Sequence, residues 1–166
     1  MSAIRYLTVD ELVYINEALP GNDQIHKILK GKQKIRDMGL LEAAAGRPQQ
    51  SVFGADAYPS LPEKAAALLH AISRNHPFAD GNKRTATMAA LLMLEVNGLR
   101  VQWEAAEALE HIIQIAEGRM TLEQFAAWLK PTPTEARLIA DSDLDADHIA
   151  RLIEEHRWLL DALMTR

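Results

Sequence analysis

The sequence predicts an all-α fold, and two observations carry that prediction. Capping-box patterns at Thr8-x-x-Glu11 and Ser60-x-x-Glu63 each open an apolar-periodic segment, which is typical of a helix N-terminus. The segment 46–59, in contrast, is broken by glycine and proline and is too short for an independent sheet. We therefore expect a helical protein in which residues 46–59 form a loop or small hairpin on the surface.

Glycine, proline and asparagine separate the expected helices. The segment 83–96 is apolar on all sides, which predicts a helix in the centre of a bundle. It ends at Asn97-Gly98, a favourable left-handed stop, and Pro77 ends the helix before it. The expected helices cover residues 9–18, 23–30, 40–45, 60–75, 83–96, 103–117, 121–130 and 145–164.

The chain divides at Pro131-Thr132-Pro133, which is typical of a stiff linker. Residues 1–130 are expected to form the main helical domain. Residues 131–166 then contain the linker and a C-terminal amphipathic helix that could dock on the core or on a partner. The apolar face of that helix consists of Ile149, Leu152, Ile153, His156, Leu160 and Leu163.

Composition excludes several classes of protein. The chain has 166 residues, 48% apolar and 25% charged, which rules out a disordered or fibrous chain. Its net charge of −5 argues against attraction to nucleic acid or anionic lipid, and the absence of cysteine excludes disulfides, thiolate zinc sites and thiol nucleophiles. No signal peptide opens the chain, and charged residues or histidine interrupt its apolar stretches. A cytoplasmic protein without membrane or direct nucleic-acid contact is expected.

A single loop, residues 76–84 with the sequence HPFADGNKR, combines several chemical functions. It precedes the buried helix, and the unpaired N–H groups and dipole of a helix start favour anions. Gly81 permits a tight turn that gathers those N–H groups into a nest suited to phosphate. Lys83 and Arg84 add two cations, of which arginine can grip phosphate through two parallel hydrogen bonds.

The same loop offers a base and a metal ligand. His76 has an unperturbed pKa of about 6.5, which suits proton abstraction near neutrality. Asp80 supplies one hard carboxylate of the kind that holds magnesium beside nucleotide phosphates, and Phe78 is expected to pin the loop to the core. Taken singly, a histidine before proline more often marks the end of a helix, and Asp-Gly-Asn more often forms a turn. Together within nine positions, they indicate phosphate transfer to a hydroxyl.

The motif H-P-F-x-D-G-N-K-R-T-A, from His76 to Ala86, resembles the Fic/Doc superfamily and within it the Doc (death-on-curing) toxins. The segment 6–12 is also similar to that family, and Arg47-Pro48-Gln49, Phe53 and Tyr58-Pro59 resemble its flap region. The resemblance covers about residues 4–130 and implies a compact Fic/Doc-like helical bundle with ATP and Mg²⁺ lying over the loop.

The resemblance also implies a role for each motif residue. His76 would be the base that deprotonates the target hydroxyl, Lys83 and Arg84 would take part in catalysis, and Asp80 would ligate Mg²⁺. The flap would hold the target peptide as an added strand. The residues that would bind the nucleotide are Gly81, Asn82, Lys83 and Arg84.

Two departures distinguish the motif from the adenylylating Fic pattern G-N-G-R-x-x-R: Lys83 replaces glycine and Thr87 replaces arginine. Doc toxins have lysine at this place and resemble kinases that bind ATP reversed and transfer its γ-phosphoryl group to a threonine of elongation factor Tu. Gly81 is a Fic-like feature, because the best-known Doc pattern has alanine there. Phosphoryl transfer is therefore favoured, with adenylyl transfer as the alternative and a non-catalytic anion- or nucleotide-binding module less favoured.

The resemblance further implies a toxin of a toxin–antitoxin pair, with a cognate antitoxin protein and a translation factor as partners. The inhibitory pattern [ST]-x-x-x-E-[GN] of some Fic proteins occurs at no serine or threonine of this chain. Control by a separate antitoxin is therefore expected. A run of basic residues is expected to be an ordinary solvated face: Lys27, Lys30, Lys32, Lys34 and Arg36.

Overall fold

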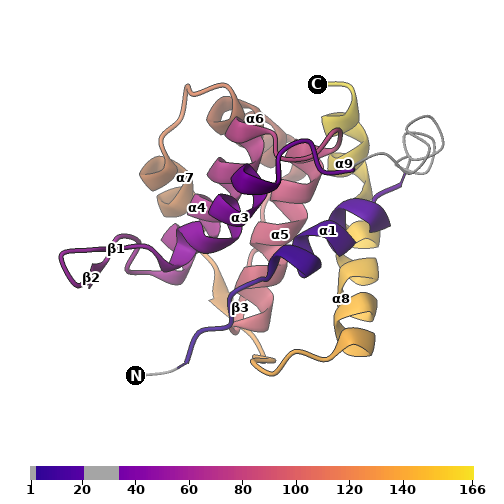
Figure 1. The fold of residues 1–166 in the computed structure, drawn as a ribbon. Coiled ribbons are helices and arrows are strands. Elements are labelled where there is room, and N and C mark those ends of the chain that lie inside the picture. Colours follow the sequence, from indigo (N-terminus) through magenta and orange to yellow (C-terminus); the bar gives the residue numbers. More distant parts are fainter. Residues whose placement is uncertain (1–2, 21–33) are drawn as a thin grey trace.

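The computed structural model describes residues 3–20 and 34–166, and these form a bundle of helices (Figure 1). The expected helix 23–30 lies outside the described residues. The helices are α1 (Val9–Ala18), α3 (Met38–Gly46), the 3₁₀ turn η1 (Arg47–Gln49), α4 (Leu61–Asn75), α5 (Asn82–Val96), α6 (Ala105–Ala116), α7 (Leu122–Leu129), α8 (Ser142–Glu155) and α9 (Arg157–Met164). No helix in this described part of the chain is long and apolar enough to cross a membrane.

Helix α5 occupies the centre of the bundle, as its apolar surface predicts (Figure 1). Every residue of α5 except Lys83 is buried. Helix α4 packs along it, and α1, α6, α8 and α9 contact its remaining sides. The all-α prediction is confirmed, and so is the capping box at Thr8, whose side chain and Glu11 satisfy each other's backbone N–H groups.

Within the segment 46–59, residues 51–56 form the small hairpin that the sequence allowed. Strand β1 (Ser51–Val52) pairs antiparallel with β2 (Ala55–Asp56) through a two-residue turn. Both turn residues, Phe53 and Gly54, have positive φ, as the tight hairpin turn with matching twist requires. Lys64 of α4 is fully buried and holds the base of the hairpin: its Nζ donates to the carbonyl of Pro48 (3.2 Å) and to Asp56 Oδ2 (3.3 Å).

The C-terminal segment differs from the prediction in two ways. The expected linker pairs in a sheet, because β4 (Thr132–Pro133) lies antiparallel to β3 (Leu99–Arg100). The expected single helix 145–164 is wrong: the chain bends at His156, between α8 and α9. Without the bend, those 20 residues would form one straight helix about 30 Å long. The bend lets α8 pack on α5 while α9 turns to pack on α6.

The apolar face expected for residues 145–164 is docked on the core. Its members Ile149, Leu152, Ile153, Leu160 and Leu163 are all buried. His156, at the bend, packs its ring edge-on against Trp103 with centroids 5.9 Å apart. The apolar face of residues 145–164 therefore packs against the helical bundle of this chain.

A buried polar network ties the N-terminus to α5 and α8. Asp145 accepts two hydrogen bonds from Arg5 (2.6 and 3.1 Å) and a third from Arg137. Arg137 also donates to His148 Nδ1 (2.8 Å), which leaves the Nε2 proton of His148 to donate to Glu95 (2.9 Å). Burial alone would raise the pKa of Asp145, but the two arginines outweigh it and hold that pKa below its usual value.

We predict that Asp145→Asn lowers the free energy of unfolding by about 3 kcal/mol at pH 7, since it leaves buried guanidinium groups without their carboxylate. A carboxyl group whose pKa is lower in the folded than in the unfolded protein stabilises the folded state at pH values above its unfolded pKa, which is about 3.9. That contribution to the free energy of unfolding is lost as the pH falls through the pKa of the folded state. The variant should therefore lose less stability than wild type on acidification in urea unfolding. Asp147→Asn, on the exposed face of α8, is the control and should stay within about 0.5 kcal/mol.

Candidate active site

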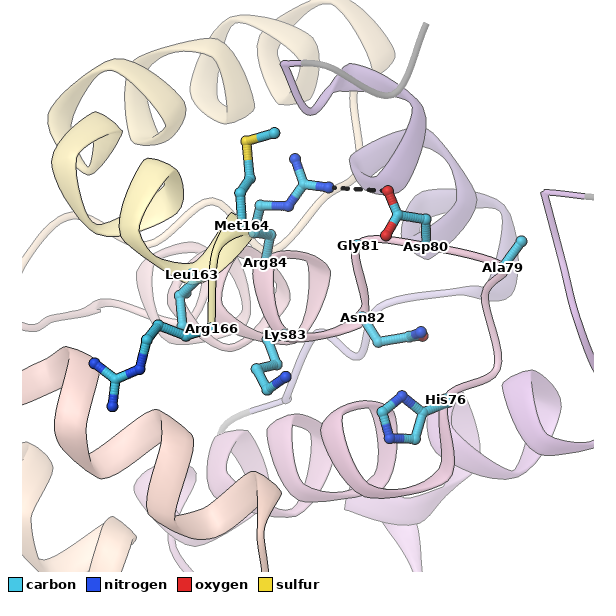
Figure 2. A pocket seen from close by; sticks show the side chains of 10 residues that line it. All are labelled: His76, Ala79, Asp80, Gly81, Asn82, Lys83, Arg84, Leu163, Met164 and Arg166. Carbon is cyan, nitrogen blue, oxygen red and sulfur yellow. Dashed lines mark hydrogen bonds and ion pairs between the residues drawn. The ribbon is translucent and has the colours of Figure 1, made fainter. Parts of the chain in front are cut away.

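The loop that joins α4 to α5 begins at His76, the residue at which α4 ends. His76 adopts a left-handed backbone (φ 51°, ψ 60°), and its N–H still donates to the carbonyl of Ile72 (3.2 Å). Pro77 follows it, as the predicted helix stop requires. The imidazole is exposed and faces the loop (Figure 2).

Asn82 holds the middle of the loop in place. The N–H of Phe78 donates to Asn82 Oδ1 (3.0 Å), and Asn82 Nδ2 donates to the carbonyl of Phe78 (3.0 Å). The Phe78 ring is buried, so it pins the loop to the core as expected. Because its amide is engaged with the loop, Asn82 presents its backbone N–H, rather than its side chain, to an anion in this conformation.

The turn at Asp80-Gly81 is fixed from a different helix. Asn16, buried in α1, donates through Nδ2 to the carbonyl of Asp80 (2.9 Å) and to Thr85 Oγ1 (3.0 Å). Gly81 sits before the first residue of α5 with φ 76°, in the left-handed region that glycine enters without strain. Asn16 was not predicted as a site residue, although a lone amide on the apolar face of a helix is a recognisable sequence signal.

A short segment before α3 covers the other side of the loop. The N–H of Arg36 donates to the carbonyl of Pro77 (2.7 Å), and the N–H of Ala79 donates to the carbonyl of Lys34 (2.8 Å). Lys34 also pairs with Glu17 (2.6 Å). Their sequence pattern suggested an ordinary solvated face, but Lys34 and Arg36 instead make specific contacts with the rest of the protein. The rest of that basic run lies outside the described residues.

A pocket of about 280 Å³ opens between this loop and the end of α9. One side consists of residues of the loop 76–84, and the other of Leu163, Met164 and Arg166 (Figure 2). The sequence did not place the C-terminal residues here. The pocket has more cationic than anionic side chains, with Asp80 as the carboxylate among its lining residues, which suits a polyphosphate.

Arg84 reaches the pocket from a buried position. Its Nη1 donates to the carbonyl of Pro20 (2.9 Å), and its Nη2 lies 3.5 Å from Asp80 Oδ2. Burial lowers the pKa of Arg84, while Asp80 and Asp161 act in the opposite direction, and a guanidinium keeps its charge in either case. Lys83, one position earlier, is only partly buried and lines the same pocket.

The environment of His76 favours its neutral form. Partial burial lowers the pKa of His76, and the positive charges of Lys83, Arg36 and Arg74 lower it further. A histidine with a pKa below about 6.5 is largely unprotonated at pH 7 and can accept a proton. The loop thus brings a neutral base, a carboxylate, cations and a helix N-terminus to one pocket.

Comparison with known proteins agrees with this arrangement. Residues 6–94, more than half of the chain, match the model of the Fic/DOC family. The chain belongs to the Fic/DOC family. It is similar to Toxin Doc of Mycolicibacterium smegmatis (46% identical over 101 residues, 60% of this chain and 78% of that protein). It is also similar to the protein kinase doc of Escherichia phage P1 (32% identical over 127 residues, 76% of this chain and 94% of that protein).

The donor set of this Fic/Doc site fits a nucleotide-bound magnesium ion. The Asp80 side chain is half exposed, so its carboxylate can turn toward a ligand in the pocket. Among the described residues, no three His, Asp or Glu side chains cluster as a metal site. Magnesium beside phosphates commonly needs one or two protein carboxylates, with phosphate and water as its other ligands. Asp80 is therefore the residue that could hold it.

The hairpin 51–56 lies in the region that the sequence resemblance assigns to the flap. Behind it, Arg47 donates to the hydroxyl of Tyr58 (3.0 Å) and to His70 Nδ1 (2.6 Å), which fixes the start of the flap against α4. Phe53 at the tip is fully exposed, and the strands lie on the surface.

We predict that Asn82→Ala destabilises the protein by about 2 kcal/mol, because it leaves the buried N–H and carbonyl of Phe78 without partners. Urea unfolding measures the loss. Asn75→Ala, at the exposed last residue of α4, is the matched control and should change stability by less than about 0.5 kcal/mol. Equal losses in the two variants would contradict the role assigned to Asn82.

Proposed function

We propose that this Fic/DOC protein is a toxin that transfers phosphate from ATP to a hydroxyl group of another protein and so arrests growth. The observation that carries the proposal is the pocket in which a neutral His76 faces the cations and the N-terminus of α5. The family match and the relative named a protein kinase support a transferase role. The relative named Toxin Doc supports the toxin role and a cognate antitoxin.

We assign each part of the proposed step to residues of the pocket. His76 accepts the proton of the target hydroxyl while the oxygen of that hydroxyl bonds to the γ-phosphorus of ATP. The bond between the γ-phosphorus and the oxygen that bridges it to the β-phosphorus then breaks, and ADP leaves. Lys83, Arg84 and the N–H groups at the start of α5 stabilise the phosphate charge. Magnesium, when held by Asp80, would neutralise further phosphate charge.

Two residues favour transfer of the γ-phosphoryl group. Lys83 occupies the start of α5, where a glycine would leave room for the polyphosphate, and its side chain lines the pocket. Thr87 is buried and donates its hydroxyl to the carbonyl of Lys83 (2.8 Å), so it brings no charge to the pocket. Gly81 matches the adenylylating pattern and supports adenylyl transfer as the second candidate.

The proposed acceptor is a threonine of a translation factor such as elongation factor Tu. The exposed edge of the hairpin 51–56 supports binding of an extended target segment, because an edge strand offers unpaired N–H and carbonyl groups.

We predict that purified protein labels a protein in cell lysate from γ-labelled ATP and not from α-labelled ATP, with ADP as the second product. His76→Ala should reduce labelling by about 10²–10⁴-fold, because it removes the base. Mass analysis of the labelled protein identifies the acceptor. Label from the α position alone would replace the kinase proposal with adenylyl transfer, and no label from either would favour a binding module.

We predict that Arg166→Ala weakens binding of ATP with Mg²⁺ about fivefold, since it removes one cation from the pocket wall. Arg166 is half exposed and lies 3.5 Å from Glu110, a pair weak enough for its side chain to turn to a phosphate. Arg157→Ala is the control, because Arg157 is the first residue of α9, pairs with Glu154 and does not line the pocket. Titration calorimetry in a His76→Ala background measures both affinities.

A further inference from the structure

We propose that Arg36 is a positioning residue for His76: its guanidinium holds the last two carbonyls before Pro77 and so fixes the direction in which the imidazole points. The inference rests on the proposed function for the role of His76 as the base. Arg36 lies outside the motif 76–86 and belongs to the short segment that precedes α3.

The contact joins one side chain to two successive carbonyl groups. Arg36 Nε donates to the carbonyl of His76 (2.6 Å), and its Nη2 donates to the carbonyl of Asn75 (2.8 Å). Carbonyls at a helix C-terminus have no partner within the helix, and the dipole there favours a cation. The planar fork of arginine can satisfy both carbonyls at once, whereas the single ammonium of lysine lacks that geometry.

His76 needs such support because of its backbone conformation. A residue other than glycine in the left-handed region persists only where its surroundings hold it. The direction of the imidazole follows from that backbone, since φ and ψ limit the side-chain rotamers. A change at the two carbonyls would therefore move the base.

The main chain of the same segment adds a second attachment. The N–H groups of Arg36 and Asp37 both donate to the carbonyl of Pro77 (2.7 and 3.1 Å). Asp37 also caps α3 by accepting from the N–H of Leu40 (3.0 Å). His76 and Pro77 are thus fixed to the start of α3 from both the side chain and the main chain of residue 36.

The charge of Arg36 acts on the imidazole as well. The cations that face His76 are Lys83 from α5, Arg36 from the segment before α3, and Arg74 from its own helix. Each lowers the pKa of His76, in addition to partial burial, while Asp80 is the carboxylate that shares the pocket. Positioning and charge can be separated, because Arg74 supplies charge without touching the carbonyls of Asn75 and His76: its Nη1 donates to Ala116 instead.

Three variants test the proposal. Arg36→Lys keeps the charge and loses the fork, Arg36→Ala loses both, and Arg74→Ala loses a charge and keeps the fork. The imidazole of His76 is titrated by NMR, with its signal assigned from the His76→Gln spectrum. Hydrogen exchange of the Ala79 amide reports the attachment of the loop, and phosphoryl transfer is measured as kcat and KM for ATP.

We expect Arg36→Lys to leave the pKa of His76 at its wild-type value, to speed exchange of the Ala79 amide about fivefold and to lower kcat about tenfold at constant KM. Arg36→Ala should show the same losses with a raised His76 pKa. Arg74→Ala should raise that pKa without lowering kcat at pH 8. A wild-type kcat and exchange rate in Arg36→Lys would overturn the proposal.

The same measurements separate this inference from the proposed function. If wild-type protein transfers no phosphate but the exchange and titration changes occur as expected, the proposed function fails and Arg36 still positions His76. If wild-type protein is active and Arg36→Lys behaves like wild type in every measurement, the proposed function stands and this inference fails.

Discussion

The burial of α5 on all sides is the constraint on which the rest of the structure depends. Every residue of this helix except Lys83 is buried, so neighbouring helices must cover each of its faces. Its N-terminus alone meets the pocket, where the first N–H groups remain available to a ligand. The same helix thus provides the centre of the core and, at its N-terminus, one part of the pocket, so a change that shifts α5 would also move the pocket.

The loop before α5 is held by polar contacts from three separate parts of the chain. Asn16 reaches it from α1, Asn82 from the start of α5, and Arg36 from the segment before α3. Each contact pairs a side chain with the loop's own backbone, where unpaired buried groups would be costly. Such support fixes reacting groups more closely than a loop could do by itself.

The C-terminal segment is joined to the bundle and to the pocket. The network of Arg5 and Asp145 ties α8 to the N-terminus, and the bend at His156 brings α9 back along α6. The end of α9 then forms one wall of the pocket. Deleting residues 131–166 would uncover buried apolar side chains as well as that wall, so single substitutions test the function of this segment more cleanly.

The sequence by itself determined the features that depend on neighbours along the chain. The capping residues Thr8 and Ser60, the stop at Pro77 and the apolar surface of residues 83–96 act over one or two helical turns, and the helices begin and end where these signals place them. The motif 76–86 likewise identified the family. Only the tertiary structure decided the pairing of Arg36 with His76, the buried amide of Asn16, the bend at His156 and the position of Arg166. These depend on contacts between residues far apart in the chain, and no local pattern encodes the distance between them.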